Sequence, residues 1–130
     1  DIKPEKGAVP AIKELSQDHI LYIVTSRPDR TAARTKEWTE KHFPSLIKEI
    51  LHTNQFSTDR ENKVSKSVIC SENGIAVLIE DAPTYAQEVS DAGIRTLLLD
   101  QPWNRDMPDS DMVTRVWSWK DAVEVIQGLQ

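Results

Sequence analysis

The apolar run Val77-Leu78-Ile79 is followed directly by two carboxylates, Glu80 and Asp81. A short unbroken apolar run of this kind is typical of a strand that is buried on both faces. Acids at the carboxyl end of such a strand lie where open α/β sheets place their ligand crevices. Because adjacent carboxylates repel each other, they are tolerated more easily when a cation, a lysine or hydrogen-bond donors offset the repulsion. The stretch therefore predicts a parallel-sheet strand that ends at a charged site.

The size and composition of the chain limit what it can be. A length of 130 residues predicts one domain, over residues 1–130, with a core of its own. The net charge of −5 gives no overall basic character, so we expect no nucleic-acid polymer as a partner. The single cysteine, Cys70, is expected to be buried and favours a reducing compartment, hence a cytoplasmic location. The apolar runs of about five residues are far shorter than the roughly 20 that a membrane helix needs, so we expect no membrane partner.

Apolar periodicity and turn signals divide the chain into alternating helices and strands. Helices are predicted over residues 9–17, 29–42, 65–72, 82–92 and 119–129, and strands over 20–24, 76–79, 95–99 and, at an edge, 113–117. Residues 45–51 suit either a helix or a short strand. The alternation predicts a three-layer α/β domain with a mostly parallel sheet.

Three features can converge at the carboxyl edge of such a sheet. Thr25 and Ser26 end the first strand, Lys66 opens a helix, and Glu80 and Asp81 end a later strand. Hydroxyls before a helix N-terminus favour phosphate, and a lysine adds a positive point charge. Carboxylates suit Mg²⁺, which prefers oxygen ligands. Together the three features predict phosphoryl chemistry.

Each feature also has a plain structural explanation. Thr25 and Ser26 could cap the next helix, and Lys66 could be a solvated surface lysine. Asp81 could cap the helix that begins at residues 82–83. The four tryptophans are expected to pack in the core, with Trp103 as the exception because it lies in a loop beside the predicted site.

The order of these features resembles motifs II, III and IV of the haloacid dehalogenase (HAD) superfamily. The matching segments are residues 22–28, 66–70 and 77–81, and the loop over residues 100–105 is similar to the 5′-nucleotidase/deoxyribonucleotidase-like branch. The resemblance covers roughly residues 4–129. It implies a Rossmannoid fold and a Mg²⁺-dependent phosphomonoesterase. The substrate would be a small phosphorylated molecule, either a nucleotide or a sugar phosphate.

The resemblance also implies roles for individual residues. Thr25 and Lys66 would be catalytic: Thr25 would hydrogen-bond the transferring phosphoryl group, and Lys66 would neutralise its charge. Lys63 competes for the second role, and we favour Lys66 because it directly precedes the helix. The resemblance implies phosphate contacts from Thr25, Ser26, Arg27 and Lys66, and a Mg²⁺ site at Glu80 and Asp81.

Motif I of the family, Asp-x-Asp-x-(Thr/Val) after a strand, would supply the nucleophile and the general acid/base. Only residues 109–113 match it by letters, and the polar residues before them cannot form a buried strand, so we treat the match as chance. The motif I strand lies in the middle of the family's sheet, and its loss would leave two strands without a neighbour. Because the chain begins at Asp1, we expect that an upstream fragment supplies this strand. A second copy, or direct closure of the flanking strands, is the alternative.

Two functions stay open. The chain could be a phosphomonoesterase core without its nucleophile segment and hence inactive alone, or a catalytically inactive HAD-derived binding or regulatory module. A response-regulator-like domain fits less well, because its acids would cluster near the first strand. Fold analogy does not decide between these functions.

Overall fold

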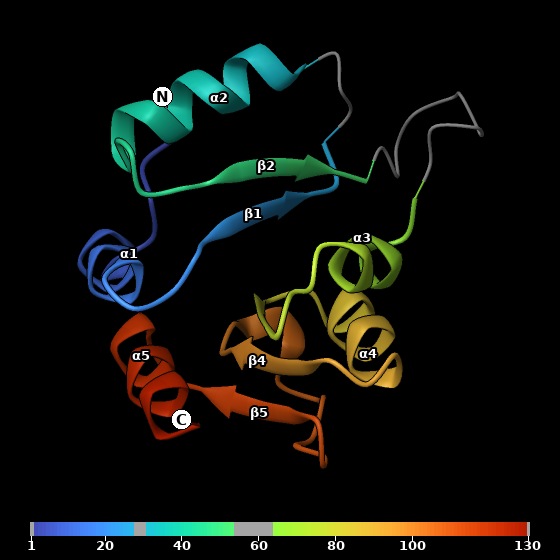
Figure 1. The fold of residues 1–130 in the computed structure, drawn as a ribbon. Helices are drawn as coiled ribbons and strands as arrows, with labels where there is room; N and C mark the ends of the chain where they lie inside the picture. The colour runs from blue at the N-terminus through green and yellow to red at the C-terminus, as the bar shows by residue number, and fades with distance from the viewer. Residues whose placement is uncertain (1, 28–30, 54–63, 130) are drawn as a thin grey trace. The chain divides into compact units, whose positions relative to one another are not determined.

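The structure, a computed structural model, describes residues 2–27, 31–53 and 64–129. The chain divides into two compact units, Asp1–Ser65 and Lys66–Gln130 (Figure 1). Each unit combines parallel strands with helices, which confirms the expected α/β class. The single domain expected from the length remains a prediction.

The first unit contains two helices and a two-stranded parallel sheet. Its elements are α1 (Ala8–Ser16), β1 (Tyr22–Thr25), α2 (Ala32–His42) and β2 (Glu49–His52). The ambiguous segment at 45–51 therefore ends in a strand, which pairs with β1 in register from Tyr22↔Glu49 to Thr25↔His52. Hydrogen bonds to a neighbouring strand, which propensity alone does not reveal, decide this conformation.

The helices of the first unit begin and end close to their predicted positions. In α1, Ala8, Ala11 and Leu15 are buried at a spacing that places them on one face. Gly7 precedes this helix with φ +85°, a left-handed conformation that favours glycine. The predicted start of α2 at residue 29 falls on residues 28–30, which lie outside the described part of the chain, and Thr31 occupies the N-cap.

The second unit contains a three-stranded parallel sheet with the order β3-β4-β5. Its elements are α3 (Lys66–Glu72), β3 (Val77–Glu80), α4 (Pro83–Asp91), β4 (Arg95–Leu99), η3 (Pro102–Asn104), β5 (Val113–Val116) and α5 (Trp119–Gly128). The strand pairs in the described part of both units are parallel, in agreement with the mostly parallel sheet that the alternating pattern predicted. The loop predicted after residue 100 contains the short 3₁₀ helix η3, and α3 and α4 lie side by side (Figure 1).

The core of the second unit is built around β4. Leu98 packs with Ala86 of α4 and Val113 of β5. Leu97 and Leu99 are also buried and face the opposite side, because side chains alternate along a strand. Helix α5 packs against β4 and β5, so β4 is covered on both faces in the manner of a three-layer domain.

Two sequence predictions about burial are wrong. The run that ends in the two acids, β3, is only partly covered: within the described residues it lies at the edge of the β3-β4-β5 sheet, and only its Leu78 is buried. Two of the tryptophans do not belong to the core, because Trp103 is 60% exposed and Trp117 is 70% exposed. Trp103 was the expected exception, whereas Trp117, directly after β5, was not.

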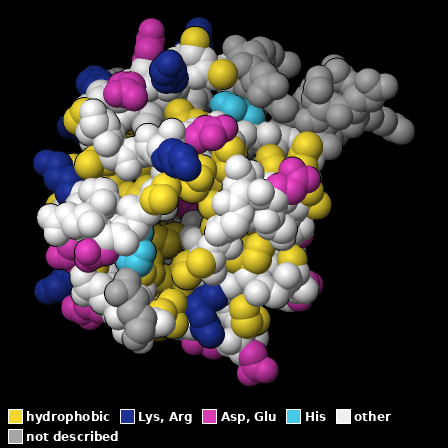
Figure 2. All heavy atoms as spheres, in the orientation of Figure 1, with side chains coloured by type: hydrophobic (Ala, Val, Ile, Leu, Met, Phe, Trp, Pro, Cys, Tyr) yellow, Lys and Arg dark blue, Asp and Glu magenta, His cyan; other side chains and the backbone are white. Residues whose placement is uncertain are grey.

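The surface agrees with the mixed composition. On the face drawn in Figure 2, the described Lys and Arg side chains lie among Asp and Glu side chains and do not gather in one basic patch. Within residues 2–27, 31–53 and 64–129, no helix is both long enough and apolar enough to cross a bilayer.

Cys70 offers a test of the packing in the second unit. The side chain is fully buried. Burial raises the pKa of the Cys70 thiol, Lys66 lowers it, and Glu80 and Glu88 raise it again. We therefore expect iodoacetamide to modify Cys70 slowly in the native protein and rapidly in urea, as measured by intact mass.

The raised pKa also predicts how stability depends on pH. The folded state keeps its thiol proton to a higher pH than the unfolded state, whose thiol ionises near pH 8.5. The free energy of unfolding should therefore hold below about pH 8.5 and fall as the pH rises towards the folded pKa. Cys70→Ala should remove this part of the fall in urea titrations. An identical alkaline slope in both proteins would contradict the prediction.

Candidate active site

Lys66 and Glu80 form a buried ion pair in the second unit. The Lys66 Nζ lies 2.7 Å from the Glu80 Oε1, and the two side chains are only 8% and 10% exposed. The same Nζ lies 4.2 Å from the centre of the Tyr85 ring. A buried lysine requires a partner of this kind, so the alternative of a solvated surface lysine is wrong. Lys63, the competing lysine, lies outside the described residues.

Glu80 also holds the turn between β3 and α4. Its Oε2 accepts hydrogen bonds from the backbone N–H groups of Asp81, at 3.0 Å, and Ala82, at 3.1 Å. Ala82 is the N-cap of α4 and makes no side-chain cap bond, so the alternative that Asp81 caps this helix is wrong, and contacts from Glu80 hold the turn instead. Lys66 and these two donors supply the lysine and the hydrogen bonds that the adjacent carboxylates were expected to need.

The start of α3 is fixed by a carboxylate from α4. Both the backbone N–H and the Oγ of Ser67 donate to the Glu88 Oε1 at 3.1 Å. A carboxylate at a helix N-terminus is favourable, because the first N–H groups have no partner within the helix. Glu88 therefore fixes the backbone next to Lys66.

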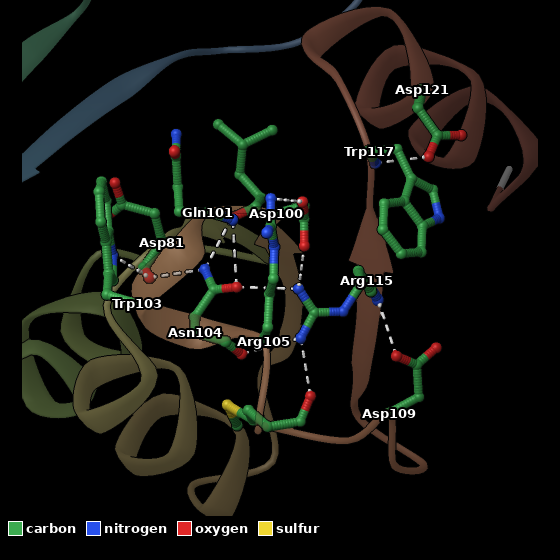
Figure 3. Close-up of polar contacts among 12 residues, drawn as sticks. Asp81, Asp100, Gln101, Trp103, Asn104, Arg105, Asp109, Arg115, Trp117 and Asp121 are labelled. Carbon is green, nitrogen blue, oxygen red and sulfur yellow. Dashed lines mark hydrogen bonds and ion pairs between the residues drawn. The ribbon is translucent and has the colours of Figure 1, made fainter.

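The main chain of Asp81 is held by the loop that follows β4. The Asp81 carbonyl accepts hydrogen bonds from the Trp103 Nε1 at 3.0 Å and the Asn104 Nδ2 at 2.9 Å (Figure 3). Trp103 therefore lies beside the predicted site, as expected from the sequence. Sequence reasoning assigned no role to Asn104, although an amide in a loop that resembles a family motif is a usable signal.

Arg115 of β5 ties this loop to the sheet. Its Nη1 donates to the Asp100 Oδ1 at 2.7 Å and to the Asn104 Oδ1 at 2.8 Å. Its Nη2 donates to the carbonyls of Asn104 and Met107 at 2.9 and 2.8 Å. The signal for this role was an arginine within a predicted strand, which has to find acceptors if its stem is buried.

The letter match to motif I lies at the amino ends of the parallel strands, opposite the end that carries Glu80 and Asp81. Residues 109–111 precede β5, whereas Glu80 and Asp81 are at and after the carboxyl end of β3, which runs parallel to β4 and β5. Asp109 accepts a hydrogen bond from the Arg115 N–H at 3.2 Å, and Ser110 accepts one from the Val113 N–H at 3.2 Å. These contacts belong to the turn before β5, which agrees with a chance match.

In the first unit, Thr25 is the last residue of β1. Its Oγ1 accepts a hydrogen bond from the Arg27 N–H at 3.1 Å. Because the N-cap of α2 is Thr31, the alternative that Thr25 and Ser26 cap this helix is wrong. Thr25 and Arg27 line a cavity of about 760 Å³ within this unit. The phosphate contacts of Thr25, Ser26 and Arg27 remain predictions.

The residues fit Mg²⁺ only in part. Within the described ranges, no group of three His, Cys, Asp or Glu side chains could hold a metal ion. Magnesium usually binds one or two protein carboxylates together with water and substrate phosphate, so a single Asp81 carboxylate is a suitable ligand. Both oxygens of Glu80 already accept hydrogen bonds, which suits Glu80 to holding Lys66. The metal roles of Glu80 and Asp81 remain predictions.

Comparison with known protein families gives a match that covers the whole chain. A family model described as 5′ nucleotidase, deoxy (pyrimidine), cytosolic type C protein (NT5C) matches residues 1–130. The chain belongs to this NT5C family. The resemblance to the nucleotidase branch of the HAD superfamily is therefore confirmed.

Two known proteins are similar to this chain over most of its length. A nucleotidase from Clostridium acetobutylicum is 27% identical over 129 residues, which cover 98% of this chain and 61% of that protein. A haloacid dehalogenase-like hydrolase from Streptococcus pneumoniae superposes with a TM-score of 0.63 at 16% identity, covering 96% of this chain and 59% of that one. The second likeness shows the shared HAD-like fold. The chain spans about three fifths of the length of both relatives.

The Lys66–Glu80 pair predicts a large effect of one substitution on stability in this NT5C-family protein. Glu80→Gln leaves the buried lysine without its counter-charge, which should lower the free energy of unfolding by about 3 kcal/mol or more in urea titrations. Adding Lys66→Met should cost less than the sum of the two single changes. Glu72→Gln, at an exposed position of α3, is the matched control and should change stability by less than about 0.5 kcal/mol. Equal effects of Glu80→Gln and Glu72→Gln would contradict the prediction.

Proposed function

We propose that this chain forms part of a Mg²⁺-dependent phosphomonoesterase that removes the phosphate from a nucleotide. The observation that carries the proposal is the buried Lys66–Glu80 pair next to Asp81, at the carboxyl end of β3. Membership of the NT5C nucleotidase family favours a nucleotide over a sugar phosphate. The single buried thiol, Cys70, favours a reducing compartment, and we propose a cytoplasmic enzyme.

In this proposal Lys66 stabilises negative charge on the transferring phosphoryl group. The Glu80 carboxylate and the Tyr85 ring hold the ammonium group at one position, so it needs little reorganisation during the reaction. Bound Mg²⁺ would neutralise further charge on the phosphate oxygens. Asp81 is the residue of this unit that we assign as its ligand, with Glu80 as the partner of Lys66.

Thr25 has the chemistry of a phosphate donor in the first unit. Its Oγ1 accepts a hydrogen bond from the Arg27 N–H, and a hydroxyl that accepts one bond can still donate its own proton. We assign this O–H to a phosphoryl oxygen. Ser26 and Arg27 follow directly in the chain and are proposed as further phosphate contacts.

We propose that the nucleophile is not among these 130 residues. An aspartate would attack phosphorus, release the nucleoside hydroxyl and form an aspartyl-phosphate, which water would then hydrolyse. The sole Asp-x-Asp run of the sequence, at 109–111, precedes β5 and lies away from Asp81. A further segment of the full-length protein would therefore supply the aspartate.

The proposal predicts a metal-dependent activity. The full-length protein should hydrolyse nucleoside monophosphates and p-nitrophenyl phosphate with Mg²⁺, and EDTA should abolish the release of inorganic phosphate. Asp81→Asn should weaken Mg²⁺ binding by more than about tenfold in calorimetry. Lys66→Met should lower kcat by a factor of about 10² to 10³. Asp106→Asn, at an exposed acid of the same unit, should leave both quantities unchanged.

Three results would each contradict a part of this proposal. Absence of turnover with every phosphomonoester tested would favour the inactive binding module. Turnover that persists in EDTA would remove the metal from the proposal. Unchanged Mg²⁺ affinity in Asp81→Asn would remove Asp81 as its ligand.

A further inference from the structure

Asn104 is a buried amide whose hydrogen-bonding capacity is fully used. The side chain is only 1% exposed. Its Nδ2 donates to the carbonyls of Asp81 and Leu99 at 2.9 and 2.8 Å. Its Oδ1 accepts from the Gln101 N–H at 3.2 Å and from the Arg115 Nη1 at 2.8 Å. An amide has two donor hydrogens and two acceptor lone pairs, so all four are satisfied.

These bonds connect the carboxyl ends of β3 and β4 with β5. Figure 3 shows the amide of Asn104 between the Asp81 carbonyl and the Arg115 guanidinium. Asp100 accepts from the same guanidinium at 2.7 Å, so the arginine is itself held in place. The positive charge of Arg115 faces the Asn104 Oδ1. The Asn104 Nδ2 is therefore directed at the carbonyls of Asp81 and Leu99. The amide therefore has one favourable orientation.

Asp81 depends on side chains because it lies beyond the sheet ladder. The pairing of β3 with β4 ends at Glu80↔Leu98. The Asp81 N–H donates to the Glu80 Oε2, and its carbonyl accepts from the Trp103 Nε1 and the Asn104 Nδ2. Side chains thus fix the peptide groups on both sides of this Cα. Fixing them sets the direction in which the Cβ and the carboxylate leave the backbone.

We propose that Trp103 and Asn104 are positioning residues for Mg²⁺ binding by Asp81. They contact the Asp81 main chain and act on the metal only through its carboxylate. This inference rests on the proposed function, because it requires Asp81 to be a ligand. Groups that orient a metal ligand contribute to affinity, and removing one typically costs about 10- to 100-fold.

Trp103→Phe tests the inference with little risk to folding. The change removes the Nε1–H donor to the Asp81 carbonyl and keeps an aromatic ring at a position that is 60% exposed. Trp117→Phe is the matched control, because Trp117 is 70% exposed in the same unit. The Cζ of Arg115 lies over the Trp117 ring, 5.8 Å from its centre, and phenylalanine keeps an aromatic ring there. Both variants should melt within a few degrees of the unchanged full-length protein.

The expected result separates metal binding from substrate binding. In calorimetry with MgCl₂ alone, Trp103→Phe should raise the Kd about tenfold, and Trp117→Phe should leave it unchanged. At saturating Mg²⁺, kcat and the KM for a nucleoside monophosphate should return to the original values in Trp103→Phe. A merely structural role would lower kcat at every Mg²⁺ concentration.

A second readout does not depend on activity. Each of the four tryptophans gives one indole N–H signal in a ¹H–¹⁵N spectrum, and the signal lost in Trp103→Phe belongs to Trp103. Adding Mg²⁺ should shift this signal, because its acceptor is the carbonyl of the proposed ligand. The signal of Trp117, identified in the same way, should stay in place.

The outcomes distinguish failure of the inference from failure of the proposed function. If the unchanged protein binds no Mg²⁺, the proposed function fails. If it binds Mg²⁺ but Trp103→Phe matches Trp117→Phe in affinity, the inference is overturned and the function stands. Asn104→Asp replaces the two donors with a carboxylate facing two carbonyls, and should weaken Mg²⁺ binding more than Trp103→Phe does if it folds. If Asn104→Asp does not fold, the comparison of Trp103→Phe with Trp117→Phe decides the inference.

Discussion

The ion pair between Lys66 and Glu80 is the constraint on which the second unit depends. A charged lysine at 8% exposure is stable only if a counter-charge and hydrogen-bond acceptors come with it, and Glu80 meets both needs at 2.7 Å. The same carboxylate holds the first N–H groups of the turn into α4. One side chain therefore fixes α3 relative to β3 and sets where α4 begins. Such a pair contributes little net stability compared with apolar residues of the same volume. Its main effect is to hold the charged group of Lys66 at one position.

A second polar cluster, around Arg115 and Asn104, does for the loop after β4 what Glu80 does for the turn after β3. The guanidinium of Arg115 can only donate hydrogen bonds. Its buried N–H groups donate to oxygens of Asp100, Asn104 and Met107. The loop has few apolar residues with which to pack, and these polar contacts give it a defined conformation instead. Asp81 lies where the two clusters meet, with its N–H held by one and its carbonyl by the other.

Local sequence predicted most of the elements and located the acids, but not the contacts between elements. The strands β4 and β5, the proline that begins α4 and the position of Lys66 at the start of α3 follow from patterns a few residues long. The burial of β3 was overestimated, because an apolar run does not reveal how completely the surrounding elements cover a strand. Asn104 and Arg115 are eleven residues apart and carry no periodic signal, so their pairing could not be predicted from spacing. Exposed Trp117 was misjudged because size and apolarity favour the core only on average.

The two adjacent carboxylates illustrate how far a motif can be interpreted without contacts. From the sequence alone, Glu80 and Asp81 are equally suitable metal ligands, since both supply hard oxygen atoms. Neighbouring residues of an extended chain point to opposite sides, so one ion cannot easily bind both unless the backbone turns between them. Glu80 is the last residue of β3 and reaches Lys66, while Asp81 lies beyond the ladder with its peptide groups fixed by Glu80, Trp103 and Asn104. The two acids therefore have separate roles. Glu80 holds the lysine and the backbone, and this support allows Asp81 to present its carboxylate.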